Sequence, residues 1–145
     1  MSTAAQRWSV GDELAQQALP PVTRLDLIRY AGASGDYNPI HTIDEEAERA
    51  GLPGVIQHGM LTMARIGLLL SAHLEHGYVK RFRTRFSGMV QLGDRITIAG
   101  RCSGVEEREE GTLYTFAVSA RKPEGRPVAS GTVEFLVFGA APGQG

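Results

Sequence analysis

Residues 59–76, Gly-Met-Leu-Thr-Met-Ala-Arg-Ile-Gly-Leu-Leu-Leu-Ser-Ala-His-Leu-Glu-His, form the longest apolar helical pattern in this chain of 145 residues. Apolar side chains cover most of its circumference, so only a narrow polar line remains through Thr62, Arg65, His73 and His76. A helix that is apolar on nearly every side has to be surrounded by other elements, and a curved sheet can surround it. The stretch therefore predicts one long central helix inside a wrapped sheet.

The second half of the chain supplies the strands for such a sheet. Alternating, β-branched and aromatic residues predict four strands: Val79–Val90, Arg95–Val105, Leu113–Lys122 and Val128–Phe138. Turn signals at Glu109–Gly111 and Pro123–Gly125 separate the last three strands, which favours antiparallel hairpins. A short apolar stretch near Leu14–Leu19 adds an edge strand. The predicted fold class is α+β, a single domain over residues 1–145 with a five-stranded antiparallel sheet around the helix and a flexible tail at about 140–145.

Two shorter helices are predicted before the central one. Thr23 has the features of an N-cap, with Asp26 at the capping-box position, and this helix should run to about Ala31. Thr42, with a glutamate three residues later, predicts a second N-cap, and Gly51 follows the expected end of that helix. The first half of the chain is therefore expected to be helical, with no linker before the strands.

Composition argues against several classes of protein. The net charge of −1 gives no electrostatic basis for binding nucleic acid, which usually needs a clearly basic domain. Cys102 is the only cysteine, so no internal disulfide can form, and its alternating strand predicts a buried, inert thiol. The N-terminus lacks the apolar core of a signal peptide, and the apolar run Met60–Leu74 is too short to span a bilayer. We expect a cytoplasmic protein without a membrane or nucleic-acid partner.

The segment Ser34-Gly-Asp-Tyr-Asn-Pro-Ile-His41 carries the first candidate chemistry. Asp36 and His41 are five positions apart, and in a helix that spacing would turn the two side chains roughly 140° apart. Gly35 and Pro39 indicate a fixed loop instead, which can aim both side chains at one point. There the carboxylate could orient a water molecule while the imidazole accepts or returns a proton. The structural alternative is that Asp36 only forms a turn and His41 is a surface histidine.

Gln57-His-Gly-Met60 opens the long helix and supplies a second element. The amides of Gly59 and Met60 are among the donors that have no partner within a helix. Because Gly59 has no side chain, a substrate oxygen can approach this positive helix end closely. Such amides can stabilise the charge that develops on a thioester carbonyl. Alternatively, Gly59 only relieves crowding between helix and sheet, and His58 only caps the helix.

The sequence predicts no metal and no cofactor. Asp36, Asn38, His41, Asp44 and His58 are close in sequence, but a calcium loop starting at Asp36 would need glycine where His41 stands. The chain has neither the His-Glu-x-x-His pair of a zinc site nor a glycine-rich nucleotide loop.

Arg81, Arg83 and Arg85 lie on one face of the first long strand by alternation. The functional interpretation is a basic edge that contacts coenzyme phosphates or an acidic carrier protein. The alternative is a solvated strand face.

Taken together, Tyr30-Ala-Gly-Ala-Ser-Gly-Asp-Tyr-Asn-Pro-Ile-His41, Ala47 and His58-Gly-Met-Leu61 resemble the MaoC-like (R)-specific enoyl hydratase family. The first segment resembles the hydratase-2 motif of that family at every defining position. The order of the elements resembles the family plan over nearly the whole chain. This resemblance implies a hotdog fold and a hydro-lyase that interconverts trans-2-enoyl and (3R)-3-hydroxyacyl thioesters without a cofactor.

The resemblance also implies roles for single residues. Asp36 and His41 would form the catalytic dyad, and the Gly59 amide would bind the thioester oxygen. His58 and Met60, which flank Gly59, are further candidates for binding the oxyanion or the substrate, as is Asn38. Asn38 would order the loop.

The resemblance further implies that the substrate is carried by coenzyme A or by an acyl carrier protein. Single-hotdog members act as dimers, so a homodimer is expected. A heterodimer is the other option, because the chain also looks like the catalytic subunit of the dehydratases of type II fatty acid and mycolic acid synthesis. Two further function classes stay open: a hotdog acyl-CoA thioesterase and a non-catalytic partner subunit. The acyl chain length and the physiological direction are not predicted.

Overall fold

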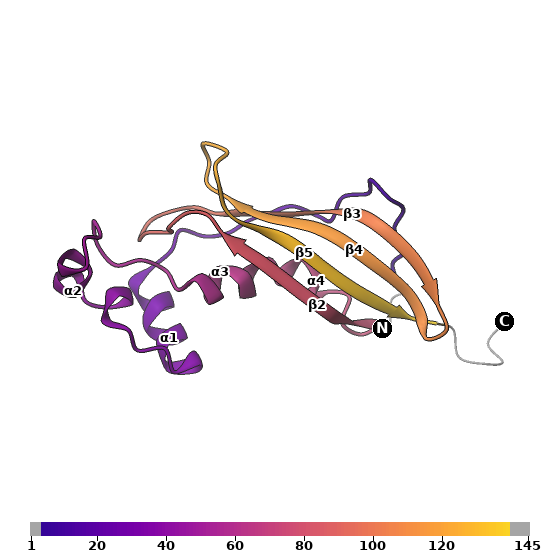
Figure 1. The fold of residues 1–145 in the computed structure, drawn as a ribbon, viewed down its shortest axis with the longest axis horizontal. Helices are drawn as coiled ribbons and strands as arrows, with labels where there is room; N and C mark the ends of the chain where they lie inside the picture. Colours follow the sequence, from indigo (N-terminus) through magenta and orange to yellow (C-terminus); the bar gives the residue numbers. More distant parts are fainter. Residues whose placement is uncertain (1–3, 140–145) are drawn as a thin grey trace.

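Five antiparallel strands form one curved sheet in the computed structural model, which describes residues 4–139 (Figure 1). The strands lie in the order β1-β3-β4-β5-β2. Their bounds are Gln17–Ala18 for β1, Gly77–Phe86 for β2, Thr97–Arg108 for β3, Gly111–Arg121 for β4 and Pro127–Phe138 for β5. The predicted α+β fold with one five-stranded antiparallel sheet is confirmed. The tail predicted at 140–145 lies outside the described residues.

Hairpins join β3, β4 and β5 as predicted, whereas β2 lies at the edge of the sheet beside β5. The strand expected over Val79–Val90 ends early, because the Ser87 and Gly88 amides both donate to the Val128 carbonyl of β5, at 2.9 and 3.2 Å, and the regular pairing stops there. Farther along, the Gln57 amide donates to the Val90 carbonyl at 2.7 Å. This segment therefore connects the sheet to the residues that precede the helical pattern.

Helix α1, Arg24–Ser34, begins as the sequence predicts. Thr23 Oγ1 accepts a hydrogen bond from the Asp26 amide at 3.2 Å, and Asp26 Oδ2 accepts one from the Thr23 amide at 2.9 Å. These two bonds complete the capping box. The helix continues past Ala31 and ends at Gly35, whose φ of 76° lies in the left-handed region that favours glycine.

Helix α2 spans Asp44–Arg49, and the N-cap predicted at Thr42 is wrong. Ile43 occupies the cap position without a side-chain hydrogen bond. Thr42 instead ends the 3-10 turn η1, Pro39–His41, because its amide donates to the Pro39 carbonyl at 3.1 Å. The acidic first turn of α2 stabilises the start of the helix electrostatically in place of a side-chain cap.

The single helix predicted for Gly59–His76 is two helices, α3 at Gly59–Ile66 and α4 at Leu68–Ser71. Gly67 separates them, and glycine has a weak helix propensity. The Leu70 amide donates to the Gly67 carbonyl at 3.0 Å, an i to i+3 contact that tightens the turn at this point. The central helical element is therefore shorter than its apolar pattern.

One side of α3 and α4 packs toward the sheet while the other side is exposed. Ile66, Leu69 and Leu70 are buried, whereas Met60 is 57% exposed and Leu68 is 44% exposed. Both helices follow one face of the curved sheet in Figure 1, and α1 and α2 gather beyond its end. The sheet of one chain thus covers only part of the apolar surface of α3 and α4. Within residues 4–139, no helix is long and apolar enough to cross a membrane.

Two glycine-to-alanine substitutions are expected to change stability in opposite directions. A Cβ atom at Gly131 of β5 would collide with the Arg83 carbonyl oxygen of β2, so Gly131→Ala should lower the free energy of unfolding by at least about 2 kcal/mol. Gly32 lies inside α1 with open space around it, so Gly32→Ala should raise that free energy by about 0.5–1 kcal/mol. Urea and thermal unfolding measure both effects. A Gly131→Ala protein as stable as the wild type would contradict the close β2–β5 pairing.

Candidate active site

The loop between α1 and α2 is fixed by its own polar side chains. Asp36 Oδ1 accepts a hydrogen bond from the Asn38 amide, and Asn38 Oδ1 accepts one from the Ile40 amide, each at 3.2 Å. Pro39 then starts the 3-10 turn that presents His41. Asp36 does form the turn that the sequence offered as a purely structural alternative. Its other carboxylate oxygen, Oδ2, faces His41, so the turn does not preclude a chemical role.

Asp36 and His41 approach each other across a short gap. His41 Nε2 and Asp36 Oδ2 are 3.7 Å apart, too far for a direct hydrogen bond and close enough for both atoms to contact one water-sized molecule. The His41 side chain is 9% exposed and that of Asp36 is 50% exposed. The imidazole therefore lies inside the protein, and the carboxylate reaches it from the solvent side.

A backbone carbonyl fixes the position of the proton on His41. Nδ1 of His41 lies 2.7 Å from the Ile56 carbonyl oxygen. Because a carbonyl oxygen can only accept, Nδ1 must carry the hydrogen, and a neutral ring then has its lone pair on Nε2. That lone pair lies on the side of Asp36. The role of Ile56 was not predicted, since a backbone carbonyl gives no signal in the sequence.

His58, from the start of α3, joins the same cluster. It is 2% exposed, and its Nε2 lies 3.3 Å from the Asp36 carbonyl oxygen. Its ring stacks on that of His41 with the centroids 3.8 Å apart. Tyr30 of α1 contacts the His58 ring edge-on, with centroids 4.8 Å apart. Residues from α1, the loop, η1 and the start of α3 therefore meet at one place.

Gly59 is the first residue of α3, so its amide and that of Met60 have no acceptor within the helix. A Cβ atom at Gly59 would lie 3.4 Å from the ring of Phe86, which is a tolerable van der Waals contact. Crowding alone therefore does not require glycine at this position. The role of the Gly59 amide in binding a substrate oxygen stays a prediction.

An apolar groove with a volume of 360 Å³ lies beside this cluster, between α3 and β2. The residues that line it are Tyr30, Met60, Met63, Ala64, Gly67, Val79 and Phe82. Tyr30 also contacts His58, and Met60 directly follows Gly59, so the groove begins at the polar cluster. Its lining carries no charged side chain, which suits a hydrocarbon chain.

The polar cluster suits proton transfer better than metal binding. Asp36, His41 and His58 can each offer a ligand atom within 4.8 Å of the others. The two imidazole planes are 23° from parallel, however, and lone pairs that lie in stacked planes do not converge on one ion. In addition, His58 Nε2 already faces the Asp36 carbonyl.

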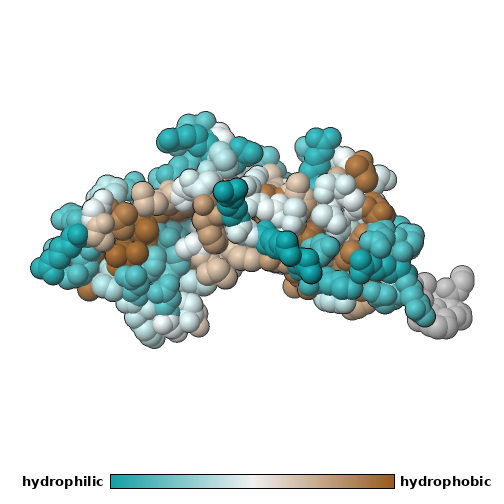
Figure 2. All heavy atoms as spheres, viewed as in Figure 1, coloured by the Kyte–Doolittle hydropathy of each residue, from teal (hydrophilic) through white to brown (hydrophobic). Residues whose placement is uncertain are grey.

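Arg81, Arg83 and Arg85 share one face of β2, and that face is turned away from the groove. Phe82 lines the groove, and alternation along the strand points Arg81 and Arg83 to the opposite side. Val79 also lines the groove because the pairing register of β2 shifts between Val79 and Arg81. Arg81 Nε also lies 3.5 Å from Glu134 Oε2 on β5. Strongly hydrophilic atoms in Figure 2 follow the line that β2 takes in Figure 1. The structure thus separates the three arginines from the other candidate residues, and their contact with phosphate or carrier protein stays a prediction.

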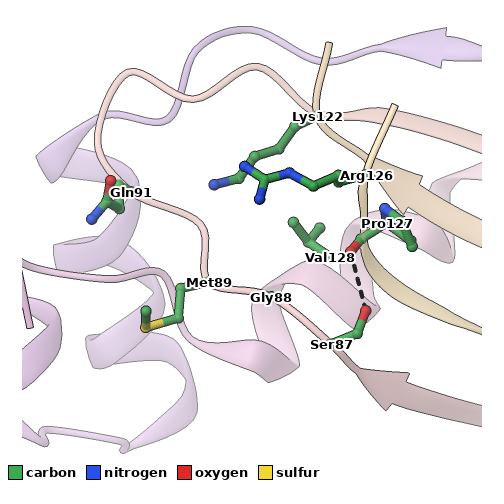
Figure 3. Close-up of a pocket in the computed structure, with 8 residues that line it drawn as sticks. All are labelled: Ser87, Gly88, Met89, Gln91, Lys122, Arg126, Pro127 and Val128. Carbon is green, nitrogen blue, oxygen red and sulfur yellow. Dashed lines mark hydrogen bonds between the residues drawn. The ribbon is translucent and has the colours of Figure 1, made fainter. Parts of the chain in front are cut away.

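A second cleft, with a volume of 230 Å³, lies between the β4–β5 hairpin and the segment after β2. Lys122 and Arg126 extend into it from the hairpin, with Gln91 on the other side (Figure 3). Lys122 Nζ lies 3.1 Å from Asp94 Oδ2 and Arg126 Nη2 lies 3.4 Å from Glu124 Oε1, so both cations are already paired within the fold. None of the candidate catalytic residues lines this cleft. The sequence did not single out these cations, because a turn separates them and no spacing pattern links them.

Burial lowers the pKa of His58, and the adjacent His41 ring lowers it further, against the opposing effect of Asp36. The unfolded chain therefore takes up a proton at this residue near the ordinary pKa of about 6.5, where folded His58 is still neutral. The contribution of neutral His58 to the free energy of unfolding is therefore complete above that pH, and it is lost as the pH falls toward the lowered pKa. Urea unfolding between about pH 8 and 5 should show this decline, and His58→Gln should make it shallower. Equal slopes for both proteins would contradict a neutral His58.

Comparison with known proteins gives one family and several relatives. The model of a MaoC like domain matches residues 5–122. Fatty acid synthase subunit beta of Aspergillus oryzae is 44% identical over 77 residues, which are 51% of this chain and 4% of that protein. The mitochondrial 3-hydroxyacyl-[acyl-carrier-protein] dehydratase of Arabidopsis thaliana is 30% identical over 112 residues, which are 77% of this chain and 65% of that protein. The chain therefore spans a small part of the fungal subunit and about two-thirds of the plant protein.

A solved structure shows the same fold. The (R)-hydratase from A. caviae involved in PHA biosynthesis superposes with a TM-score of 0.80, covering 92% of this chain and 99% of that one. The sequence identity is 22%, so this likeness concerns the fold alone. The curved sheet with its short helical element is thus shared at low sequence identity.

Proposed function

The chain belongs to the MaoC-like domain family, and we propose that it catalyses the reversible hydration of trans-2-enoyl thioesters to (3R)-3-hydroxyacyl thioesters. One observation carries this proposal: the Asp36–His41 pair lies beside the helix start at Gly59, where an apolar groove begins. The substrate class is further supported by the relatives, which include a 3-hydroxyacyl-carrier-protein dehydratase and an (R)-hydratase.

The proposed reaction needs a base, an acid and a donor to the thioester oxygen. In hydration, the lone pair on His41 Nε2 accepts a proton from a water molecule that Asp36 orients. The water oxygen adds to C3, and the electrons of the C2–C3 double bond move to the thioester oxygen, where the Gly59 amide stabilises the charge. The enolate then takes a proton at C2 from the imidazolium, which restores neutral His41. Dehydration is the reverse sequence.

The acyl chain of the substrate would lie in the groove, with its thioester at Gly59 and its carrier outside the protein. The carrier is coenzyme A or an acyl carrier protein. The reaction moves protons and adds water without a change in oxidation state at the enzyme, so the proposal includes no cofactor and no metal.

Two parallel assays test the function. Incubation with crotonyl-CoA and longer enoyl thioesters should remove the enoyl-thioester absorbance, and chiral analysis should find the (3R) product. A thiol reagent in the second assay should detect no release, because hydration leaves the thioester intact. Thiol release that keeps pace with the absorbance loss would support a hotdog thioesterase instead. A substrate panel of graded chain length, linked to coenzyme A or to carrier protein, then resolves specificity.

We propose that a second hotdog chain, a copy of this one, covers the exposed apolar side. Met60 and Val79 line the groove yet are 57% and 40% exposed, so the groove is incomplete in one chain. Within residues 4–139, β2 pairs with β5 on one side only and is an edge strand of the sheet, which is the kind of edge that proteins usually cover.

Native mass measurement should therefore give about twice the chain mass of 15.6 kDa. Leu68→Glu, which puts a charge on the exposed side of α4, should shift the protein toward monomer, because a buried unpaired charge opposes association. Arg108→Glu at the β3–β4 hairpin is a control that should leave the mass unchanged. A wild-type monomer that gains activity only with another hotdog chain would support a heterodimer.

A further inference from the structure

We propose that His58 is a positioning residue that holds the Asp36–His41 pair in a fixed position relative to the Gly59 amide. This inference rests on the proposed hydratase function and assigns His58 a task that does not require contact with substrate. Among the described residues, His58 touches both members of the pair and directly precedes Gly59 in the chain.

The first contact is to the backbone of the loop. His58 Nε2 and the Asp36 carbonyl oxygen are 3.3 Å apart, and a carbonyl can only accept, so Nε2 must carry the hydrogen. This bond attaches the loop at Asp36 to the N-cap residue of α3, which directly precedes Gly59. It therefore couples the position of the carboxylate to that of the Gly59 amide.

The second contact is the ring stack. The His58 and His41 centroids are 3.8 Å apart and the planes differ by 23°, so the His58 ring limits the tilt of the His41 ring. The Ile56 carbonyl holds His41 at Nδ1, 2.7 Å away. Together, the stack and the hydrogen bond fix the direction of the lone pair on His41 Nε2.

These hydrogen bonds give the stacked rings opposite tautomers. His41 carries its hydrogen on Nδ1 and His58 carries it on Nε2. The Nδ1 atom of His58 is buried and has no hydrogen-bond partner in the described part of the chain. A proton added there would be buried without an acceptor, which disfavours the charged form.

The groups that face His58 are few. His41 stacks on it from η1, Tyr30 meets its edge from α1, and Asp36 is present through its carbonyl and, at longer range, its carboxylate. Burial and His41 act against the charged form of His58, and they outweigh Asp36, so the pKa is lowered. His58 is therefore a neutral donor in the range where hydration would be measured.

Two variants separate the hydrogen bond from the stack. In His58→Gln the amide nitrogen can reach the place of the imidazole Nε2–H, so the bond to the Asp36 carbonyl is retained. In His58→Phe the ring stack is retained and the bond is lost. We expect His58→Phe to lower kcat by about 10²-fold with KM changed only a few-fold, since small misplacements of reacting groups cost about that much. We expect His58→Gln to keep kcat within about tenfold of the wild type.

Nitrogen-15 NMR of the histidine rings gives a readout that does not depend on activity. The wild type should show His41 as the Nδ1–H tautomer and His58 as the Nε2–H tautomer, and His58 should stay neutral below the ordinary histidine pKa. His58 in the Nδ1–H tautomer would overturn the inference. If His58→Phe does not fold, His58→Asn replaces it, because the shorter amide cannot reach the Asp36 carbonyl.

The outcomes distinguish this inference from the proposed function. An inactive wild type would refute the function itself. An active wild type with an inactive Asp36→Asn variant and an unimpaired His58→Phe variant would refute only the role of His58. Loss of activity in His58→Phe, retained in His58→Gln, at equal melting temperatures supports the positioning role.

Discussion

Asp36→Asn is expected to lower kcat for enoyl-thioester hydration by at least about 10²-fold while leaving the fold intact. Asparagine keeps the side-chain oxygen that accepts from the Asn38 amide at 3.2 Å, so the turn can still form. It loses the negative charge that faces His41 Nε2 at 3.7 Å. Without that charge, neither the orientation of water nor the stabilisation of the imidazolium is available. Steady-state kinetics measure the loss of kcat, and thermal unfolding checks that the fold is intact.

Asp44→Asn is the matched control. The Asp44 side chain is 48% exposed, close to the 50% of Asp36, and Asp44 also belongs to a charged pair, with Arg24 at 2.8 Å. An exposed ion pair contributes at most about 1 kcal/mol, so this variant should keep wild-type kinetics. Similar rates for Asp36→Asn and the wild type would remove Asp36 from the mechanism.

Local signals were enough to predict the loop and the start of α1. The capping box at Thr23 and Asp26 involves residues three positions apart, and the turns at Asp36 and Asn38 each involve an amide two positions later. Interactions over so few residues are fixed by the side chains themselves. Gly35 adds a left-handed residue at the end of α1. Where the physics is local, the sequence pattern was sufficient.

Places where two signals compete were not predictable in the same way. The apolar pattern runs from Gly59 to His76, yet the helix is interrupted at Gly67, where the weak helix propensity of glycine and a tighter turn outweigh the apolar periodicity. Thr42 has the sequence of an N-cap but ends the preceding 3-10 turn. Alternation put three arginines on one strand face, and only the position of Phe82 in the groove showed that this face is the outer one.

The site combines residues whose sequence signals differ in strength. The Asp36 and His41 side chains are visible in one short segment, whereas their partners are the Ile56 carbonyl and the His58 ring. These partners decide which nitrogen of His41 is free to act as a base. The loop alone therefore indicates which residues are reactive, and the start of α3 determines how they are oriented.

His41→Asn is expected to abolish most activity, lowering kcat by at least about 10²-fold, with only a modest loss of stability. The asparagine amide can take the place of Nδ1–H and donate to the Ile56 carbonyl. In the wild type, this carbonyl oxygen lies 2.7 Å from His41 Nδ1. The asparagine side chain has no atom in the position of Nε2, so no base faces Asp36. Asparagine also cannot stack on the His58 ring, and the loss of this contact should lower the melting temperature by a few degrees. His76→Asn, outside the cluster, is the control and should retain activity.

The double variant Asp36→Asn/His41→Asn tests whether the two side chains act as one unit. Groups that share a proton and a water molecule lose their joint contribution when either is removed, so the second substitution should add little. We therefore expect the double variant to be within about tenfold of the slower single variant. Independent groups would instead multiply the two losses to about 10⁴-fold or more. A multiplicative result would mean that Asp36 and His41 serve separate steps, and the single-water mechanism would have to be replaced.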